Sequence, residues 1–114
     1  MQFMLLIYQP HPFDPKALSP EAYAEVAKDY AAINQTPGVT SGPPLGLTSK
    51  AVTVRVTDGE TAATQGPYAG AAHAVGGTLL LDAESLDEAV ALAARIPAAR
   101  LGGAVEVRPC EVYW

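Results

Sequence analysis

The sequence predicts an α+β fold in which two helices lie on one face of an antiparallel sheet. Two observations carry this prediction. Two segments with helix-start signals are separated by strands that read as a hairpin, and each helix is followed by a strand. At 114 residues the chain has room for one hydrophobic core, so we expect a single domain over 1–114.

The first third of the chain predicts a strand and then a helix. Residues 3–8 form a nearly continuous apolar run, which is typical of a central strand covered on both faces. Ser19-Pro20-Glu21 combines an N-cap, a proline in the first turn and an early acid, so a helix begins there. Pro37-Gly38 ends it. Its expected apolar side consists of Tyr23, Val26, Ala27, Tyr30 and Ile33.

The middle of the chain predicts strands. Residues 39–47 are interrupted by Gly42-Pro43-Pro44, which favours either a short, irregular strand or an edge segment. Residues 52–57 alternate valine with polar side chains, the period of a half-buried strand. Asp58-Gly59 is a hairpin turn signal, and residues 61–64 then return alongside the previous strand.

The last third predicts a strand at 77–82, a second helix, and a final strand at 104–108. Ser85 and Glu88 have the spacing of a capping box, and Pro97 stops the helix. Its expected apolar face consists of Leu86, Ala89, Val90, Ala93 and either Ile96 or Pro97. The order strand, helix, strands, helix, strand favours a ferredoxin-like sandwich over an alternating parallel α/β fold.

Composition argues against several classes of function. A net charge of -5 repels phosphate backbones, so we expect no nucleic-acid binding. No apolar segment approaches the length of a membrane span, and the opening apolar run lacks a basic leader. The single cysteine, Cys110, cannot form an internal disulfide, and no basic neighbour in sequence activates it. We therefore expect a cytoplasmic protein with a structural thiol and no membrane association.

Four blocks of the chain resemble the DGPF branch of the YCII-related family, and together they cover almost its whole length. Each block alone is a common pattern, but their order and spacing are specific. The blocks are Phe3-Met4-Leu5-Leu6-Ile7-Tyr8, Val52-Thr53-Val54-Arg55 with Asp58-Gly59, Gln65-Gly66-Pro67-Tyr68-Ala69 with Gly76-Gly77, and Leu86-Asp87-Glu88-Ala89 running into 102–109.

The resemblance implies a ferredoxin-like fold of the dimeric α+β barrel type, in which two sheets pack face to face across a homodimer. It also implies a pocket between sheet and helices. Members of the family mostly have no assigned reaction, and some are found alongside extracytoplasmic-function sigma factors. Fold kinship alone supplies no mechanism.

The chain departs from the family pattern at its polar positions. The motif's Asp is Gln65, its Phe is Tyr68, and the usual acid-containing stretch is 70–74, which holds only glycine, alanine and His73. Related YCII proteins carry a His and Asp pair suspected of catalysis. The first helix of this chain has no histidine; its polar aromatic residues are Tyr23 and Tyr30.

Four residues are candidates for a site. His73 titrates near neutral pH and lies in the signature segment, which suits a general acid or base; the alternative is a histidine that only bonds backbone. The Tyr68 hydroxyl either donates a hydrogen bond to a ligand, or the Tyr68 ring packs into the neighbouring core. Tyr8 and His11 lie at the end of the first strand, where both could line the mouth of a pocket. The alternative for Tyr8 is packing within the strand, and the alternative for His11 is a rigid, exposed turn.

No metal or cofactor site is expected. Two isolated histidines and one cysteine lack the spacing of metal ligands. Gly76-Gly77 lacks the remaining glycines, the lysine and the helix start of a phosphate-binding loop.

The sequence leaves two functions open. The first is a homodimer that holds a small organic ligand at the signature segment, with a lyase- or isomerase-type reaction in which His73 moves a proton and Tyr68, Tyr8 and His11 orient the substrate. The alternative is a non-catalytic module that regulates a partner such as an extracytoplasmic-function sigma factor or a larger enzyme. An open cavity lined by His73 and Tyr68 favours the first; a closed one with an exposed apolar patch elsewhere favours the second.

Overall fold

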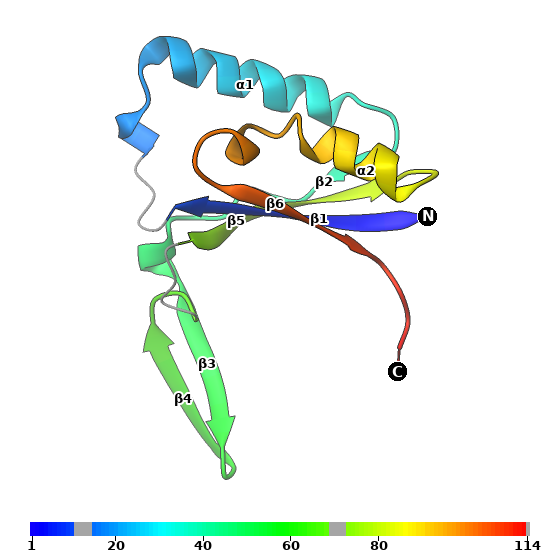
Figure 1. The fold of residues 1–114 in the computed structure, drawn as a ribbon. Helices are drawn as coiled ribbons and strands as arrows, with labels where there is room; N and C mark the ends of the chain where they lie inside the picture. Colours follow the sequence, from blue (N-terminus) through cyan, green and yellow to red (C-terminus); the bar gives the residue numbers. More distant parts are fainter. Residues whose placement is uncertain (11–14, 69–72, 114) are drawn as a thin grey trace.

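A four-stranded antiparallel sheet forms the centre of the protein (Figure 1). A computed structural model describes residues 1–10, 15–68 and 73–113. The sheet has the order β2-β5-β1-β6, and both helices lie on one of its faces (Figure 1). The predicted α+β fold is therefore confirmed, and it is consistent with the ferredoxin-like type. The elements of this layer are β1 (Gln2–Pro10), α1 (Pro20–Asn34), β2 (Val39–Ser41), β5 (His73–Asp82), α2 (Leu86–Ala93) and β6 (Ala104–Pro109).

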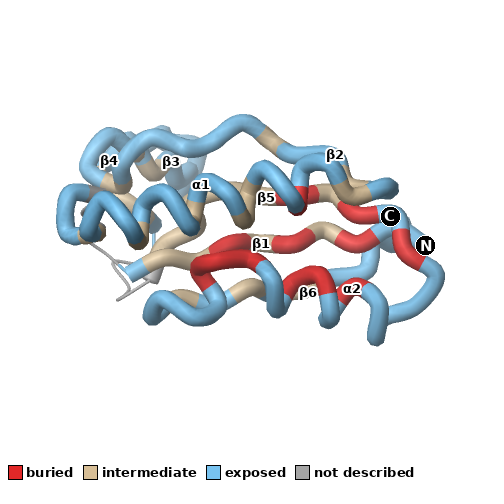
Figure 2. Tube along the Cα trace, turned by 90° about the horizontal axis from the view of Figure 1, so that it is seen from above, coloured by how far each residue is buried: buried red, intermediate tan, exposed pale blue. Residues whose placement is uncertain are grey.

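The core lies between the helices and the central strand β1. Phe3, Leu5 and Ile7 alternate along this strand and are at most 5% exposed. Figure 2 shows the buried positions gathered along β1 and the α2 region, whereas most of α1 is exposed. Met4 and Leu6 point to the opposite face and are only partly buried. In the single chain the helices thus cover one face of this strand, and not both faces as its continuous apolar run predicts.

Helix α1 begins where the sequence predicts. The Ser19 hydroxyl accepts a hydrogen bond from the Ala22 N–H at 3.1 Å, which satisfies one of the donors that a helix leaves open at its start. Of the predicted apolar side only Ile33 is fully buried, and Tyr23 is 60% exposed. After the helix, Gly38 has φ +88°, and a Cβ there would lie 2.5 Å from the Asp82 carbonyl oxygen. Only glycine suits this approach to β5.

Helix α2 also begins at its predicted cap, but its buried side differs from the prediction. The Ser85 hydroxyl accepts from the Glu88 N–H at 3.2 Å, while the Glu88 carboxylate accepts from the Glu84 N–H and not from Ser85. Leu86 and Val90 are 53% and 50% exposed, so the prediction that they face the core is wrong. The buried residues of this helix are Ala89, Leu92 and Ala93.

A hairpin of β3 (Val52–Thr57) and β4 (Glu60–Gln65) forms a separate two-stranded sheet. It projects on the side of the main sheet opposite to the helices (Figure 1). Asp58 and Gly59 both have positive φ, which confirms the predicted turn. Along β3, Val52, Val54 and Val56 are 60–66% exposed, so the prediction of a half-buried strand is wrong for the single chain. The alternating valines show that one face of the strand is apolar, but the pattern does not show which surface covers that face.

The remaining elements are single turns of 3-10 helix. They are η1 (Pro15–Ala17), η2 (Thr48–Lys50) and η3 (Pro97–Ala99).

Candidate functional site

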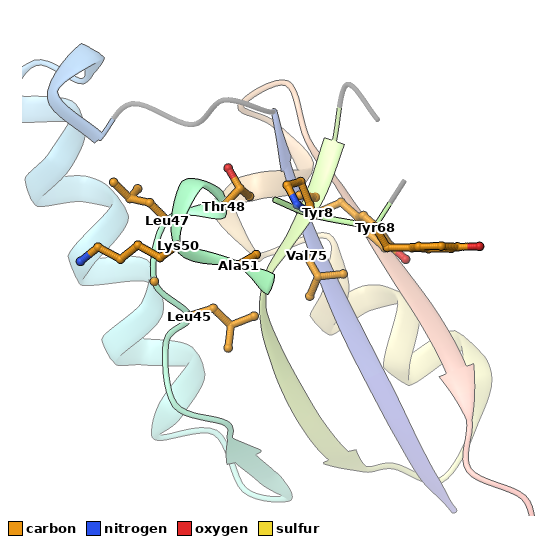
Figure 3. A pocket seen from close by; sticks show the side chains of 11 residues that line it. Tyr8, Leu45, Leu47, Thr48, Lys50, Ala51, Tyr68 and Val75 are labelled. Atoms are coloured by element: carbon orange, nitrogen blue, oxygen red, sulfur yellow. The ribbon is translucent and has the colours of Figure 1, made fainter. Parts of the chain in front are cut away.

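A cavity of about 570 Å³ lies where the base of the hairpin meets the end of the main sheet (Figure 3). We call it the hairpin cavity. Tyr8 and Val75 face each other in the pairing of β1 with β5, on the sheet face away from the helices. The described residues that line the cavity are Tyr8, Leu45, Gly46, Leu47, Thr48, Lys50, Ala51, Pro67, Tyr68, Ala74 and Val75.

Hydrogen bonds hold the signature segment against the base of the hairpin. The Gly66 N–H donates to the Ala51 carbonyl at 2.7 Å, and the Thr53 hydroxyl donates to the Gly66 carbonyl at 2.7 Å. The side-chain amide of Gln65 donates to the Ser49 carbonyl at 3.1 Å. An ionised aspartate, the residue of the related motif at this position, has no donor for that bond. Gln65 therefore ties η2 to β4, which shapes one wall of the cavity.

The lining is mostly apolar, with a few hydrogen-bonding groups. Figure 3 shows Leu45 directed toward Val75, while the Lys50 side chain runs the other way. Hydroxyls come from Tyr8, Tyr68 and Thr48, and Lys50 carries the one charge among the described lining residues. Such a cavity suits an apolar ligand body that is oriented by a small number of polar contacts.

Tyr68 forms the outer edge of the hairpin cavity. Its side chain is 72% exposed, so it does not plug the core. The Arg55 guanidinium lies 5.7 Å from the centre of its ring, a cation–π distance that links the signature segment to β3.

The structure brings two of the four predicted site residues to one cavity. Tyr8 and Tyr68 both line it. The backbone of His73 begins β5 opposite Pro10, directly before two lining residues, but its side chain lies outside the described part of the structure. His11 lies outside the described residues altogether.

Sequence reasoning missed the wall formed by residues 45–51. That segment was recognised only as irregular chain after Gly42-Pro43-Pro44. Its alternating Leu45 and Leu47 are the only signal that could have indicated an apolar wall.

A second, smaller cleft of about 300 Å³ lies on the helix side of the sheet, between α1 and β5. We call it the α1 cleft. Its polar lining residues are Tyr30 and Asn34 from the helix, Gln9 from β1, Ser41 from β2 and Thr78 from β5. Burial raises the pKa of the Tyr30 hydroxyl, and the nearby Arg100 guanidinium opposes this by a smaller amount.

Two further searches concern the described part of the chain only. Within it, no three or more histidine, cysteine, aspartate or glutamate side chains gather closely enough to hold a metal ion. None of the helices described there has the length and apolar character needed to cross a membrane.

Comparison with known proteins gives the family. A search of curated proteins found no match. A family model for the YCII-related domain matches residues 1–112, which is nearly the whole chain, and the two helices over an antiparallel sheet agree with that match. Assignment to the DGPF branch stays a prediction. The chain belongs to the YCII-related family.

Proposed function

We propose that this YCII-related protein is a homodimer that holds a small organic molecule in the hairpin cavity. One observation carries the proposal: the cavity of about 570 Å³ is lined mainly by apolar side chains and also by both tyrosines that the sequence indicated as site candidates, Tyr8 and Tyr68. That volume falls within the usual range of ligand pockets, roughly 300–1,000 Å³. The proposed ligand class is a small acid, phenol or carbonyl compound with an apolar body, because the lining is mostly apolar and its polar residues are Tyr8, Tyr68, Thr48 and Lys50.

The chemistry best suited to this site is a lyase- or isomerase-type reaction with one proton transfer. An imidazole both accepts and donates a proton near neutral pH, so His73 is the proposed acid or base. Its place in the chain supports this, since the two residues that follow it, Ala74 and Val75, line the cavity. Tyr8, Tyr68 and His11 are the proposed orienting residues.

The homodimer is supported by apolar surface that a single chain leaves open. Met4, Leu6 and Leu80 lie on the sheet face away from the helices and are only partly buried. The hairpin next to that face is exposed at nearly every residue, and an isolated two-stranded hairpin is at best marginally stable in water. A second copy packed face to face would cover both surfaces. With one cysteine and no expected membrane association, the cytoplasm is the proposed compartment.

The test combines native mass spectrometry with a thermal-shift screen of small acids, phenols and carbonyl compounds. We expect a dimer, and a ligand present at 100 times its Kd stabilises it by about 2.7 kcal/mol, which raises Tm by several degrees. His73→Ala should still bind the ligand but lose turnover. Tyr23→Phe, at an exposed position of α1, is the control and should change neither ligand binding nor turnover. A dimer that responds to no compound rules out the proposed ligand site.

The alternative function, an interaction module without chemistry, has one observation in its favour. The valine face of the projecting hairpin is exposed, and exposed apolar patches mark interaction sites. A partner such as an extracytoplasmic-function sigma factor or a larger enzyme would then cover it in place of a second copy. A chain that stays monomeric, ignores the ligand screen and binds a purified sigma factor in calorimetry would favour this function over the first.

A further inference from the structure

The α1 cleft has no role in the function proposed above, and it is built differently from the hairpin cavity. Its floor is the backbone of Gly77 in β5, next to Gly76, over which the Gln9 side chain lies. Tyr30 and Asn34 of α1 also line it. Residues 42–44 close the outer side. The cleft and the hairpin cavity lie at the same end of the sheet, and a further hollow of about 400 Å³ shares lining residues with both.

The floor of the cleft is open because Gly77 has no side chain. A Cβ added at this position would meet nothing nearer than the Ile7 Cδ1 at 4.0 Å. Neither steric conflict nor a left-handed backbone conformation therefore requires glycine at Gly77. What the glycine does provide is empty space directly above the strand.

The outer wall of the cleft is fixed at both ends. The Gly42 N–H donates to the Thr78 carbonyl at 3.0 Å, and the Leu45 N–H donates to the Gly76 carbonyl at 3.3 Å. Between these two anchors lie Pro43 and Pro44, which have restricted φ angles and no N–H groups. The cleft is therefore a preformed feature of the fold and does not depend on a ligand to shape it.

The polar groups of the cleft are neutral. Ser41 donates its hydroxyl proton to the Asn34 side-chain oxygen, so Asn34 presents its NH₂ group and Ser41 its oxygen lone pairs. The Tyr30 hydroxyl is neutral near pH 7, and burial raises its pKa further. No described residue that lines the cleft is ionisable apart from Tyr30, and nearby Arg100 is paired with Asp29. An ionised ligand would find no counter-charge here, and desolvating it would be costly.

We propose that the α1 cleft binds a small, flat, uncharged molecule with an amide or lactam group. The open space above Gly77, with Tyr30 among the lining residues, gives room for a planar body. The amide of Asn34 and the oxygen of Ser41 offer one donor and one acceptor, which match the carbonyl and N–H of such a group. A cleft of about 300 Å³ limits the ligand to roughly one ring with its substituents. The proposal does not rest on a ligand or a reaction in the hairpin cavity.

Nicotinamide and nicotinate test the proposal, because they share a ring and differ in the charge of one group. Each is titrated into the ¹⁵N-labelled protein and followed by two-dimensional NMR. Nicotinamide should shift the backbone signal of Gly77 and the side-chain amide signal of Asn34, and nicotinate should bind at least tenfold more weakly. Uracil, a ring with two lactam-type groups, should shift the same signals as nicotinamide.

Two variant pairs locate the site. Gly77→Ala places a methyl group in the floor and should weaken nicotinamide binding at least tenfold, whereas Gly46→Ala, in the hairpin cavity, should leave it unchanged. Tyr30→Phe should weaken binding severalfold through one lost hydrogen bond, and Tyr23→Phe should not. Equal binding of the two compounds, shifts confined to Tyr8 and Val75, or no shift up to the solubility limit of nicotinamide and uracil would each overturn the proposal.

Discussion

Tyr30 lies at the contact between α1 and the sheet, and its hydroxyl titrates differently in the folded and unfolded chain. Burial raises its pKa above the usual value of about 10, and Arg100 lowers it by a smaller amount. A raised folded-state pKa means that the folded protein holds the phenolic proton more tightly than the unfolded chain does. This contribution to stability is complete below the unfolded pKa and is lost as the pH rises through the folded pKa.

Tyr30→Phe should therefore flatten the alkaline side of the stability curve. The free energy of unfolding of the wild type is expected to fall as the pH rises above about 10, and this part of the fall should be absent from the variant. Urea unfolding at a series of pH values measures both curves. Tyr23→Phe is the matched control, since Tyr23 on the same helix is 60% exposed and its surroundings change little on unfolding. Equal alkaline slopes for wild type and Tyr30→Phe would contradict the prediction.

At the same scale, the candidate site was only partly predictable. Tyr8 and Tyr68 were found because each belongs to a recognisable segment, the first strand and the Gly-Pro turn. Leu45 and Lys50 were missed because an irregular segment has no period from which the direction of a side chain can be inferred. The role of His73 stays a prediction.

At the scale of elements, α2 shows how a short helix misleads a pattern. Its start was predicted correctly because the Ser85 cap is a local interaction. Its buried side was predicted wrongly, since six of its eight residues are alanine, leucine or valine and offer more than one apolar face, so the choice depends on packing against the sheet. Leu92, which was left out of the predicted face, is 6% exposed, whereas Val90, which was included, is 50% exposed.

A pair of substitutions on this helix separates the two faces. Leu92→Ala should lower the free energy of unfolding by about 2–5 kcal/mol, because it removes buried methyl groups and leaves a cavity. Val90→Ala should change it by no more than about 0.5 kcal/mol, since the lost contact is half exposed and alanine favours the helix. Chemical denaturation of both variants measures the difference. A larger loss for Val90→Ala would show that the helix is rotated relative to the structure.

For the hairpin, the strands and the turn were predicted correctly, but their position in the fold was not. Its strands and its Asp58-Gly59 turn were predicted because alternation and turn geometry are local. Its position was not, because the period of a strand identifies an apolar face but not the surface that covers it. Val52, Val54 and Val56 were expected to lie half buried, and they instead lie exposed on a separate two-stranded arm.

At the scale of the whole molecule, the fold is complete on one side of the sheet and open on the other. The helices bury Phe3, Leu5 and Ile7, while the opposite face keeps partly buried apolar side chains and has the hairpin beside it (Figure 1). Two-layer domains are stable when each apolar face is covered. The continuous apolar run of β1, which predicts burial on both faces, fits this arrangement if a second copy supplies the missing layer.

Val54→Asp should therefore convert the proposed homodimer into monomers. The substitution places a charge in the middle of the valine face, where packing against a second copy would desolvate it. Ala62→Asp is the matched control, because Ala62 is also exposed and pairs with Arg55 on the other face of the same hairpin, so both variants change the net charge equally. Sedimentation equilibrium of the three proteins measures the result.

Dimers in all three would show that the valine face lies outside the interface, and a monomeric wild type would contradict the homodimer itself. Because Val54 is 60% exposed in the single chain, the variant's monomer should unfold with nearly the stability expected of a wild-type monomer, so that lost association is separated from lost folding.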